Sequence, residues 1–209
     1  MRSLFMASTA ALDSYSASPT AIQRAVARLV KRRVHITLVF FAAMVVWSLA
    51  SGVRPHDLTD VTDAQSWIGI ALVMSGVLIR SWAAGTLHKH AELTTVGPYS
   101  LIRNPLYVGS FMLMVGFCTL IGQTHNLWIV AGPFALLFLY TVRHEEKILA
   151  DQYGPVWTSY SERTPRFIPS QILAQSGNWS MHQWKKNREY QAALAATAGL
   201  MAIQAWQSL

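Results

Sequence analysis

The stretch that decides the fold is NPLYVGSFMLMVGFCTLIGQTHNLWIVAGPFALLFLYTV, residues 104–142, in which none of the 39 residues is Asp, Glu, Lys or Arg. A single bilayer-spanning helix uses only about 20 residues, so one helix does not account for this length. Its middle, Gly122-Gln123-Thr124-His125-Asn126, consists of residue types that favour turns. The sequence therefore predicts a helical hairpin over about residues 106–142, with limbs that each reach roughly 25 Å.

The composition favours a membrane protein over a soluble one. Hydrophobic residues make up 52% of the 209 residues and charged residues only 13%, whereas soluble domains carry about 25% charged residues. Two further apolar runs precede the hairpin, at residues 34–53 and at residues 67–87, the second interrupted by Arg80. These two runs make a buried helical hairpin of a soluble protein the weaker interpretation of residues 106–142. The sparse charge argues against a nucleic-acid partner, and the single cysteine, Cys118, excludes an intramolecular disulfide framework.

The distribution of Lys and Arg predicts the orientation, because short cytoplasmic loops carry an excess of both. Basic residues are concentrated before residue 34, in the loop at residues 88–103 and after residue 142, whereas the loop after the first run has three Asp residues against Arg54. We therefore expect a multi-pass protein of a bacterial inner membrane, with the N-terminus and the functional site on the cytoplasmic side.

The predicted organisation has three parts. Residues 1–33 form a cytoplasmic N-terminal region with an amphipathic helix that begins near Pro19 and lies on anionic lipid, although an organelle transit peptide has a similar composition. Residues 34–169 form the transmembrane core. Residues 170–209 form an extension in which residues 190–209 fit either a fifth membrane helix or a helix docked on the bundle. The expected fold is an all-α integral membrane protein with four to five transmembrane helices and cytoplasmic cofactor-binding segments.

Two polar clusters lie at the predicted cytoplasmic ends of the hairpin. The first is GPYSLIRNPLYVG at residues 97–109, and the second is Arg143-His144-Glu145-Glu146. Because the hairpin turns back on itself, the clusters face one another across a helix–helix spacing of about 8–10 Å. The alternative is that the arginines only anchor the topology and the glutamates are their solvated partners. No phosphate-binding glycine motif occurs, and no metal site is predicted.

These clusters carry a resemblance. The motifs GPY at residues 97–99, RNPLYVG at residues 103–109, Glu145-Glu146 and TPRFIP at residues 164–169 occur in this order, with Tyr153-Gly154 between the last two. The pattern resembles the isoprenylcysteine carboxyl methyltransferase family over about 40% of the chain. Members of that family are integral membrane enzymes that transfer a methyl group from S-adenosylmethionine (SAM).

The resemblance implies a site for SAM and roles for individual residues. Carboxylates and aromatic faces suit the ammonium, sulfonium and ribose groups of SAM, and an arginine can hold its carboxylate. If the acceptor is a thiol or an ammonium, His144 or Glu146 could remove its proton. The catalytic residues expected on this basis are Arg143 and Glu146. The expected cofactor-binding residues are Ala91, Glu92, Leu93, Thr94, Tyr99, Arg103, Asn104, Pro105, Leu106, Tyr107 and Glu145.

Two departures from the family pattern bear on the substrate. Enzymes that act on prenylated cysteine carry an arginine at the position of Thr141, and Asn104 stands where histidine is more common. The expected acceptor is therefore lipid-like or a small hydrophobic molecule, either isoprenylcysteine carboxylate or a related compound, and membrane lipids are the expected surroundings. The alternatives are a sterol-type membrane reductase and a non-catalytic membrane scaffold or transporter subunit. The oligomeric state does not follow from the sequence.

Overall fold

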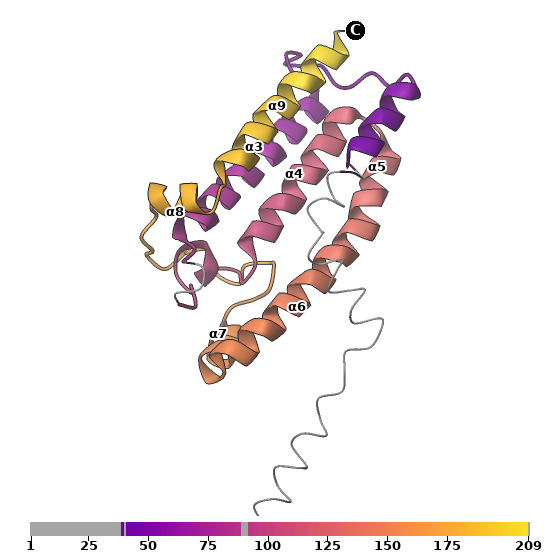
Figure 1. Ribbon diagram of the computed structural model, residues 1–209. Coiled ribbons are helices and arrows are strands. Elements are labelled where there is room, and N and C mark those ends of the chain that lie inside the picture. The colour runs from indigo at the N-terminus through magenta and orange to yellow at the C-terminus, as the bar shows by residue number, and fades with distance from the viewer. Residues whose placement is uncertain (1–38, 40, 89–91, 209) are drawn as a thin grey trace, which may run out of the picture. The chain divides into compact units, whose positions relative to one another are not determined.

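The computed structural model describes residues 39, 41–88 and 92–208, and the chain divides into two compact units, Met1–Ala43 and Met44–Leu209. The amphipathic helix predicted before residue 34 and the expected cofactor residue Ala91 lie outside the described residues. Within the second unit, every regular element that the structure describes is helical (Figure 1). This confirms the all-α prediction for that part of the chain.

Two helices among the described residues are long and apolar enough to cross a membrane. They are α3 (Ala64–Thr86) and a continuous helix over His125–Tyr153. The carboxylate of Asp63 caps α3 by accepting a hydrogen bond from the backbone N–H of Gln65. Two other apolar helices, Phe41–Ala50 and Pro105–Ile121, are shorter. Two spans are thus supported by length and composition, and the total of four to five stays a prediction.

The predicted hairpin turn is confirmed at Gly122 and Gln123, but it is shorter than predicted, because Thr124, His125 and Asn126 already belong to the next helix. Helix α4 (Pro105–Ile121) ends at Gly122, whose φ of 82° lies in the left-handed region that glycine adopts without steric cost. The Gly122 N–H donates to the carbonyl oxygens of Cys118 and Thr119, and the next helix, α5 (Thr124–Ile129), begins two residues later.

The second limb of the hairpin is one helix with a widened turn. Helix α5 continues through a π-helical segment, η2 (Val130–Phe134), into α6 (Ala135–Tyr153). Pro133 lies inside η2 and has no N–H to donate, which favours a local departure from α-helical hydrogen bonding. The helix runs well past the predicted end at residue 142, so both Glu145 and Glu146 lie on a helix.

Helices α3 and α4 pack through facing glycines, which we call the glycine seam. A Cβ atom added to Gly76 would lie 2.7 Å from the carbonyl oxygen of Gly109. One added to Gly116 would lie 2.9 Å from the carbonyl oxygen of Gly69. Small residues at these positions let the two backbones approach closely, as is common between membrane helices.

The C-terminal helix α9 (Tyr190–Gln207) lies along α3 and α4 and is bound at both of its ends. At one end, the Arg80 guanidinium donates to both carboxylate oxygens of Glu189, at 2.7 and 2.9 Å. At the other end, the Gln204 side chain donates to Asp57 and accepts from the backbone N–H of Leu58. Residues 190–207 thus form a helix that packs on the bundle, and the fifth membrane span stays a prediction. Helix α9 is not among the described helices apolar enough to qualify as a span.

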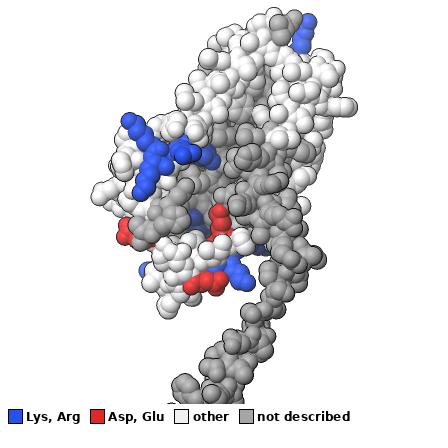
Figure 2. Space-filling view, in the orientation of Figure 1, with Lys and Arg blue, Asp and Glu red and all other residues white. Residues whose placement is uncertain are grey.

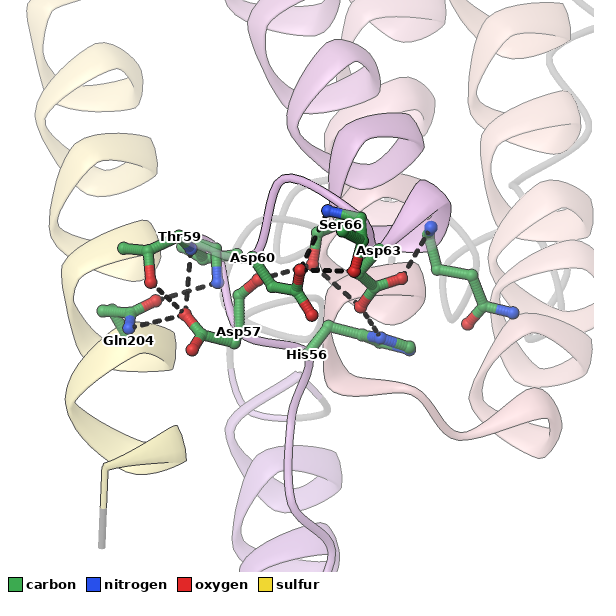
Figure 3. A network of polar contacts seen from close by, with 10 residues as sticks. His56, Asp57, Thr59, Asp60, Asp63, Ser66 and Gln204 are labelled. Atoms are coloured by element: carbon green, nitrogen blue, oxygen red, sulfur yellow. Dashed lines mark hydrogen bonds and ion pairs between the residues drawn. The ribbon is translucent and has the colours of Figure 1, made fainter.

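Gln204 belongs to a polar network at the end of the bundle that also carries the hairpin turn (Figure 3). We call this end the far end. In this far-end network Asp57 accepts from the backbone and hydroxyl of Thr59, Ser66 donates to Asp63, and the His56 ring lies 2.5 Å from the same carboxylate. The network consists of His56, Asp57, Thr59, Asp60, Asp63, Ser66 and Gln204.

Charged side chains are unevenly distributed over the surface. On the face shown in Figure 2 they gather over the opposite end of the bundle, which carries α7 (Pro155–Arg163) and α8 (Met181–Lys186). The flanks of the helices above them are uncharged apart from basic atoms at the far end. We call the charged end the cavity end, for the reason given next.

Candidate functional site

A cavity of about 350 Å³ lies at the cavity end, within the usual range for small-molecule sites. Its wall comes from the segment after α3, from the 3₁₀ turn η1 (Gly97–Ser100) with the following loop, and from α6 and α7. The described residues that line it are Leu87, His88, Glu92, Leu93, Thr94, Tyr99, Arg103, Glu145, Ile148, Leu149, Gln152, Tyr153, Trp157 and Tyr160.

One face of α6 forms much of this wall. Glu145, Ile148, Leu149 and Gln152 are spaced by three, four and seven residues, which places them on the same side of a helix. After α6, Gly154 adopts φ 50°, and this positive angle allows the chain to turn directly into α7. The turn brings the aromatic residues of α7 to the same cavity as the α6 face.

The backbone of Tyr99 accepts a hydrogen bond, whereas its side-chain hydroxyl has no partner among the described residues. The Tyr160 hydroxyl donates to the Tyr99 carbonyl oxygen at 2.7 Å. The Tyr99 hydroxyl is itself buried and has no hydrogen-bond partner among the described residues. Burial raises the pKa of Tyr99 well above its usual range, so the phenol stays neutral and is available as a donor.

Arg103 presents a second buried donor without a partner. Its Nε atom makes no hydrogen bond with the described residues, and the nearest Glu146 oxygen lies 3.6 Å away. The guanidinium carbon lies 5.8 Å from the centroid of the Trp157 ring, which favours a cation–π contact. The Arg103 backbone N–H donates to the Pro165 carbonyl oxygen at 2.9 Å. The backbone and the ring thus orient a side chain that keeps an unused N–H.

Glu146 lies behind this wall, in a buried ion network. The Arg166 guanidinium donates to both of its carboxylate oxygens, at 2.6 to 3.1 Å. The Asn104 amide donates to the same carboxylate at 3.0 Å. The network joins α6 to the start of α4 and to the segment after α7. It confirms that the two ends of the hairpin meet, as the sequence predicts.

The structure separates the predicted site residues into two groups. Those that line the cavity are Glu92, Leu93, Thr94, Tyr99, Arg103 and Glu145. The predicted residues not among the described lining residues are Asn104, Pro105, Leu106, Tyr107, Arg143 and Glu146. Arg143 is exposed, whereas Asn104 contacts Glu146 and Tyr107 packs edge-on against the Phe138 ring.

Several lining residues were not assigned to the site from the sequence. Helical spacing from Glu145 would have identified Ile148, Leu149 and Gln152. No local signal identifies Leu87 or His88, because their place depends on how the segment after α3 packs. A second, adjoining cavity of about 240 Å³ shares His88, Glu92, Leu93 and Thr94 and is also lined by Asn178.

Comparison with known proteins identifies the family. The phospholipid methyltransferase family model matches residues 64–156. The nickel-cobalt-cadmium resistance protein NccN of Alcaligenes xylosoxydans xylosoxydans is 31% identical over 150 residues, which are 71% of this chain and 70% of that protein. The cobalt-zinc-cadmium resistance protein CzcN of Cupriavidus metallidurans is 31% identical over 141 residues, 66% of this chain and 65% of that protein.

A more distant relative bears on the chemistry. The protein-S-isoprenylcysteine O-methyltransferase of Schizosaccharomyces pombe is 27% identical over 99 residues, 47% of this chain and 42% of that enzyme. No solved structure matches the chain. The chain therefore belongs to the phospholipid methyltransferase family of membrane proteins, in the group that is similar to isoprenylcysteine carboxyl methyltransferase.

Proposed function

We propose that the protein is a SAM-dependent membrane methyltransferase that acts on a lipid-like or small hydrophobic acceptor. The observation that carries the proposal is the pair of buried donors, the Tyr99 hydroxyl and the Arg103 Nε, both on residues that line the cavity and both without a partner among the described residues. Buried donors are normally paired, and leaving one unpaired costs about 1–3 kcal/mol. A ligand that accepts hydrogen bonds would remove this cost.

The residues of the cavity fit SAM group by group. Arg103 suits the carboxylate of the methionine part, and the carboxylates of Glu92 and Glu145 suit its ammonium or the ribose hydroxyls. Tyr99 supplies a neutral hydroxyl donor, and the Trp157 ring offers an apolar face to adenine or to the sulfonium. Both the donors and the acceptors that SAM requires are therefore present in one cavity.

When bound, SAM supplies a methyl group already activated by its sulfonium, so the chain contributes alignment and exclusion of water. Arg103 and Glu145 fix the charged groups, and the buried aromatic residues of α7 exclude water. We propose that Glu146 acts from behind the cavity: it holds Asn104 and Arg166 and attracts Arg103, which fixes the direction of the guanidinium. The exposed position of Arg143 gives no support to its expected catalytic role.

The charges of the cavity bear on the choice of acceptor. Thr141, which stands where enzymes of prenylated cysteine have an arginine, is fully buried and donates its hydroxyl to the Leu137 carbonyl oxygen at 2.7 Å. Arg103 is then the only Lys or Arg among the described lining residues. We therefore propose to screen uncharged lipids and small thiols beside prenylcysteine analogues, using SAM labelled in its methyl group.

Isothermal titration of the detergent-solubilised protein with S-adenosylhomocysteine tests cofactor binding. We expect binding that is lost in Glu145→Ala and Tyr99→Ala. If the wild type does not bind, or if neither substitution weakens binding, the proposal is wrong. Oxidation of NADPH with a sterol would favour the reductase alternative. If both substitutions leave the function of the protein unchanged and no cofactor binds, the scaffold alternative is favoured.

The names of the two bacterial relatives motivate a second proposal, that this site contributes to resistance against nickel, cobalt, zinc or cadmium ions. Its test is growth of a metal-sensitive bacterial host that carries the wild type, Glu145→Ala or the far-end variant Asp57→Asn. We expect the wild type and Asp57→Asn to raise tolerance and Glu145→Ala not to. Equal tolerance in all three strains and in the empty-vector strain would exclude a role for the cavity.

A further inference from the structure

The segment that joins α7 to α8, together with the first turn of α8, has an unusual composition. From Phe167 to Trp184 there are 18 residues without Asp, Glu, Lys or Arg, flanked by Arg166 and by Lys185-Lys186. We call residues 167–184 the strap. It lies outside the family match at residues 64–156, and only its first three residues, Phe167-Ile168-Pro169, belong to the TPRFIP motif.

The strap is bound to the cavity end along its length. The Gln171 side chain donates to the Ser100 carbonyl oxygen at 3.0 Å, and the Gln175 N–H donates to the Ser100 hydroxyl at 2.8 Å. The Gly97 N–H donates to the Gln175 carbonyl oxygen at 3.0 Å. The Trp179 indole N–H then donates to the Ser81 carbonyl oxygen on α3. In Figure 1 the strap accordingly passes the ends of α3 and α4.

Three apolar side chains of this hydrogen-bonded segment are almost fully exposed to solvent. Ile168, Ile172 and Leu173 are 81%, 96% and 85% exposed, which makes them the most exposed large hydrophobic side chains of the described chain. Three large apolar side chains left this exposed within six residues of sequence favour a contact with a partner or a membrane. Because the strap is hydrogen-bonded to η1 and α3, these groups cannot turn inward without breaking those bonds.

The surroundings favour lipid as the contact. The strap lies where the membrane-spanning helix α3 ends, so it lies at the level of a bilayer surface. The exposed side chains of Lys185, Lys186 and Arg188 follow it directly. Exposed apolar side chains followed in the sequence by a basic cluster are a combination that binds the boundary of an anionic membrane.

We propose that the strap is a membrane-interface anchor, which inserts Ile168, Ile172 and Leu173 among the acyl chains of an anionic leaflet. The inference does not require the proposed methyl transfer. It does connect the lipid surface to the cavity, because the same strap holds Ser100 next to Tyr99 and contributes Asn178 to the adjoining cavity.

Site-directed labelling of the full chain in nanodiscs of phosphatidylcholine and phosphatidylglycerol tests the proposal. In a Cys118→Ala background, Ile172→Cys carries an environment-sensitive fluorophore, and nitroxide-labelled acyl chains act as the quencher. The matched control is Thr158→Cys, an exposed site on the polar helix α7. We expect at least twofold stronger quenching at position 172 than at position 158, together with a blue-shifted emission.

Equal quenching at the two positions, or stronger quenching of position 172 by aqueous iodide than by nitroxide lipid, would overturn the proposal. It would then favour a protein partner for the strap. If Ile172→Cys does not give folded protein, Leu173→Cys reports on the same insertion. Because fluorescence does not depend on catalysis, a negative result here is distinguishable from failure of the proposed activity.

Discussion

The two ends of the helix bundle both carry polar networks, but they differ in whether their hydrogen-bond donors have partners. In the far-end network every labelled side chain of Figure 3 takes part in a hydrogen bond with a neighbouring residue. At the cavity end, Tyr99 and Arg103 keep buried donors that lack a partner among the described residues. A network that satisfies itself contributes to stability, whereas one that leaves buried donors unpaired is prepared for a ligand.

The largest expected effect comes from removing a cavity-end donor. We expect Arg103→Gln to weaken binding of S-adenosylhomocysteine by about 100-fold, in line with the roughly 2–5 kcal/mol lost when one partner of a buried charge pair is truncated. The matched control is Arg143→Gln, which should bind within about twofold of the wild type because Arg143 is exposed. Similar losses in both variants would contradict the distinction between lining and non-lining arginines.

The glycine seam lies between the two networks, so damage to it should affect both ends. We expect Gly76→Ala to lower the free energy of unfolding by about 2 kcal/mol, because the new methyl group would meet backbone atoms that cannot move freely. Gly132→Ala is the control, since nothing lies within 4 Å of its added Cβ. Thermal unfolding in detergent measures both variants. An equal change in the two would show that α3 and α4 are not in close contact.

A smaller effect is expected from the residue behind the cavity. Glu146→Gln removes the negative charge that attracts Arg103 and Arg166, and we expect about a tenfold loss of S-adenosylhomocysteine affinity. Arg166→Met should cause a similar loss, and the double variant should be little worse than either single one, because both act through one network. Additive losses measured by titration calorimetry would show instead that the two residues act independently.

The smallest effect is expected at the far end, on stability alone. Hydrogen bonds from Thr59 and Gln204 lower the pKa of Asp57. A carboxyl with a lowered pKa in the folded state stabilises the protein above its ordinary pKa, and this contribution is lost as the pH falls through the lowered value. We expect Asp57→Asn to lower the Tm slightly at pH 7, by an amount that shrinks as the pH falls below 3.8, with unchanged ligand binding. A loss of S-adenosylhomocysteine binding in Asp57→Asn would contradict the distinction between the two ends.

The sequence was sufficient wherever local chemistry determines the structure. Gly122 marks the hairpin turn because glycine tolerates a positive φ, and the uncharged run shows that two limbs must share that turn. Once the hairpin is predicted, the meeting of Asn104 with Glu146 follows from geometry. The face of α6 that lines the cavity could also have been predicted, because its residues repeat with helical spacing.

Features that depend on contacts between distant segments were not predictable in this way. The glycine seam requires the register of α3 against α4, which periodicity does not supply. The strap has no regular secondary structure over most of its length, and its position depends on hydrogen bonds to Ser100, about 70 residues earlier. The role expected for Arg143 depended on which side of the helix it occupies, and the rotation of that helix depends on the π segment.

That π segment has a consequence for protein engineering. A π turn accommodates one residue more than an α turn, and each residue of an α-helix advances the direction of the next by about 100°. Deleting one residue within Val130–Phe134 would therefore let the wide turn close to an ordinary α turn, and α6 beyond it would keep its direction. The same deletion between Phe134 and Glu145, where no wide turn absorbs it, would rotate the rest of α6 by about 100° and take Glu145 out of the cavity wall. The π segment is thus the place where this helix tolerates the loss of a residue without a change in which residues of α6 face the cavity.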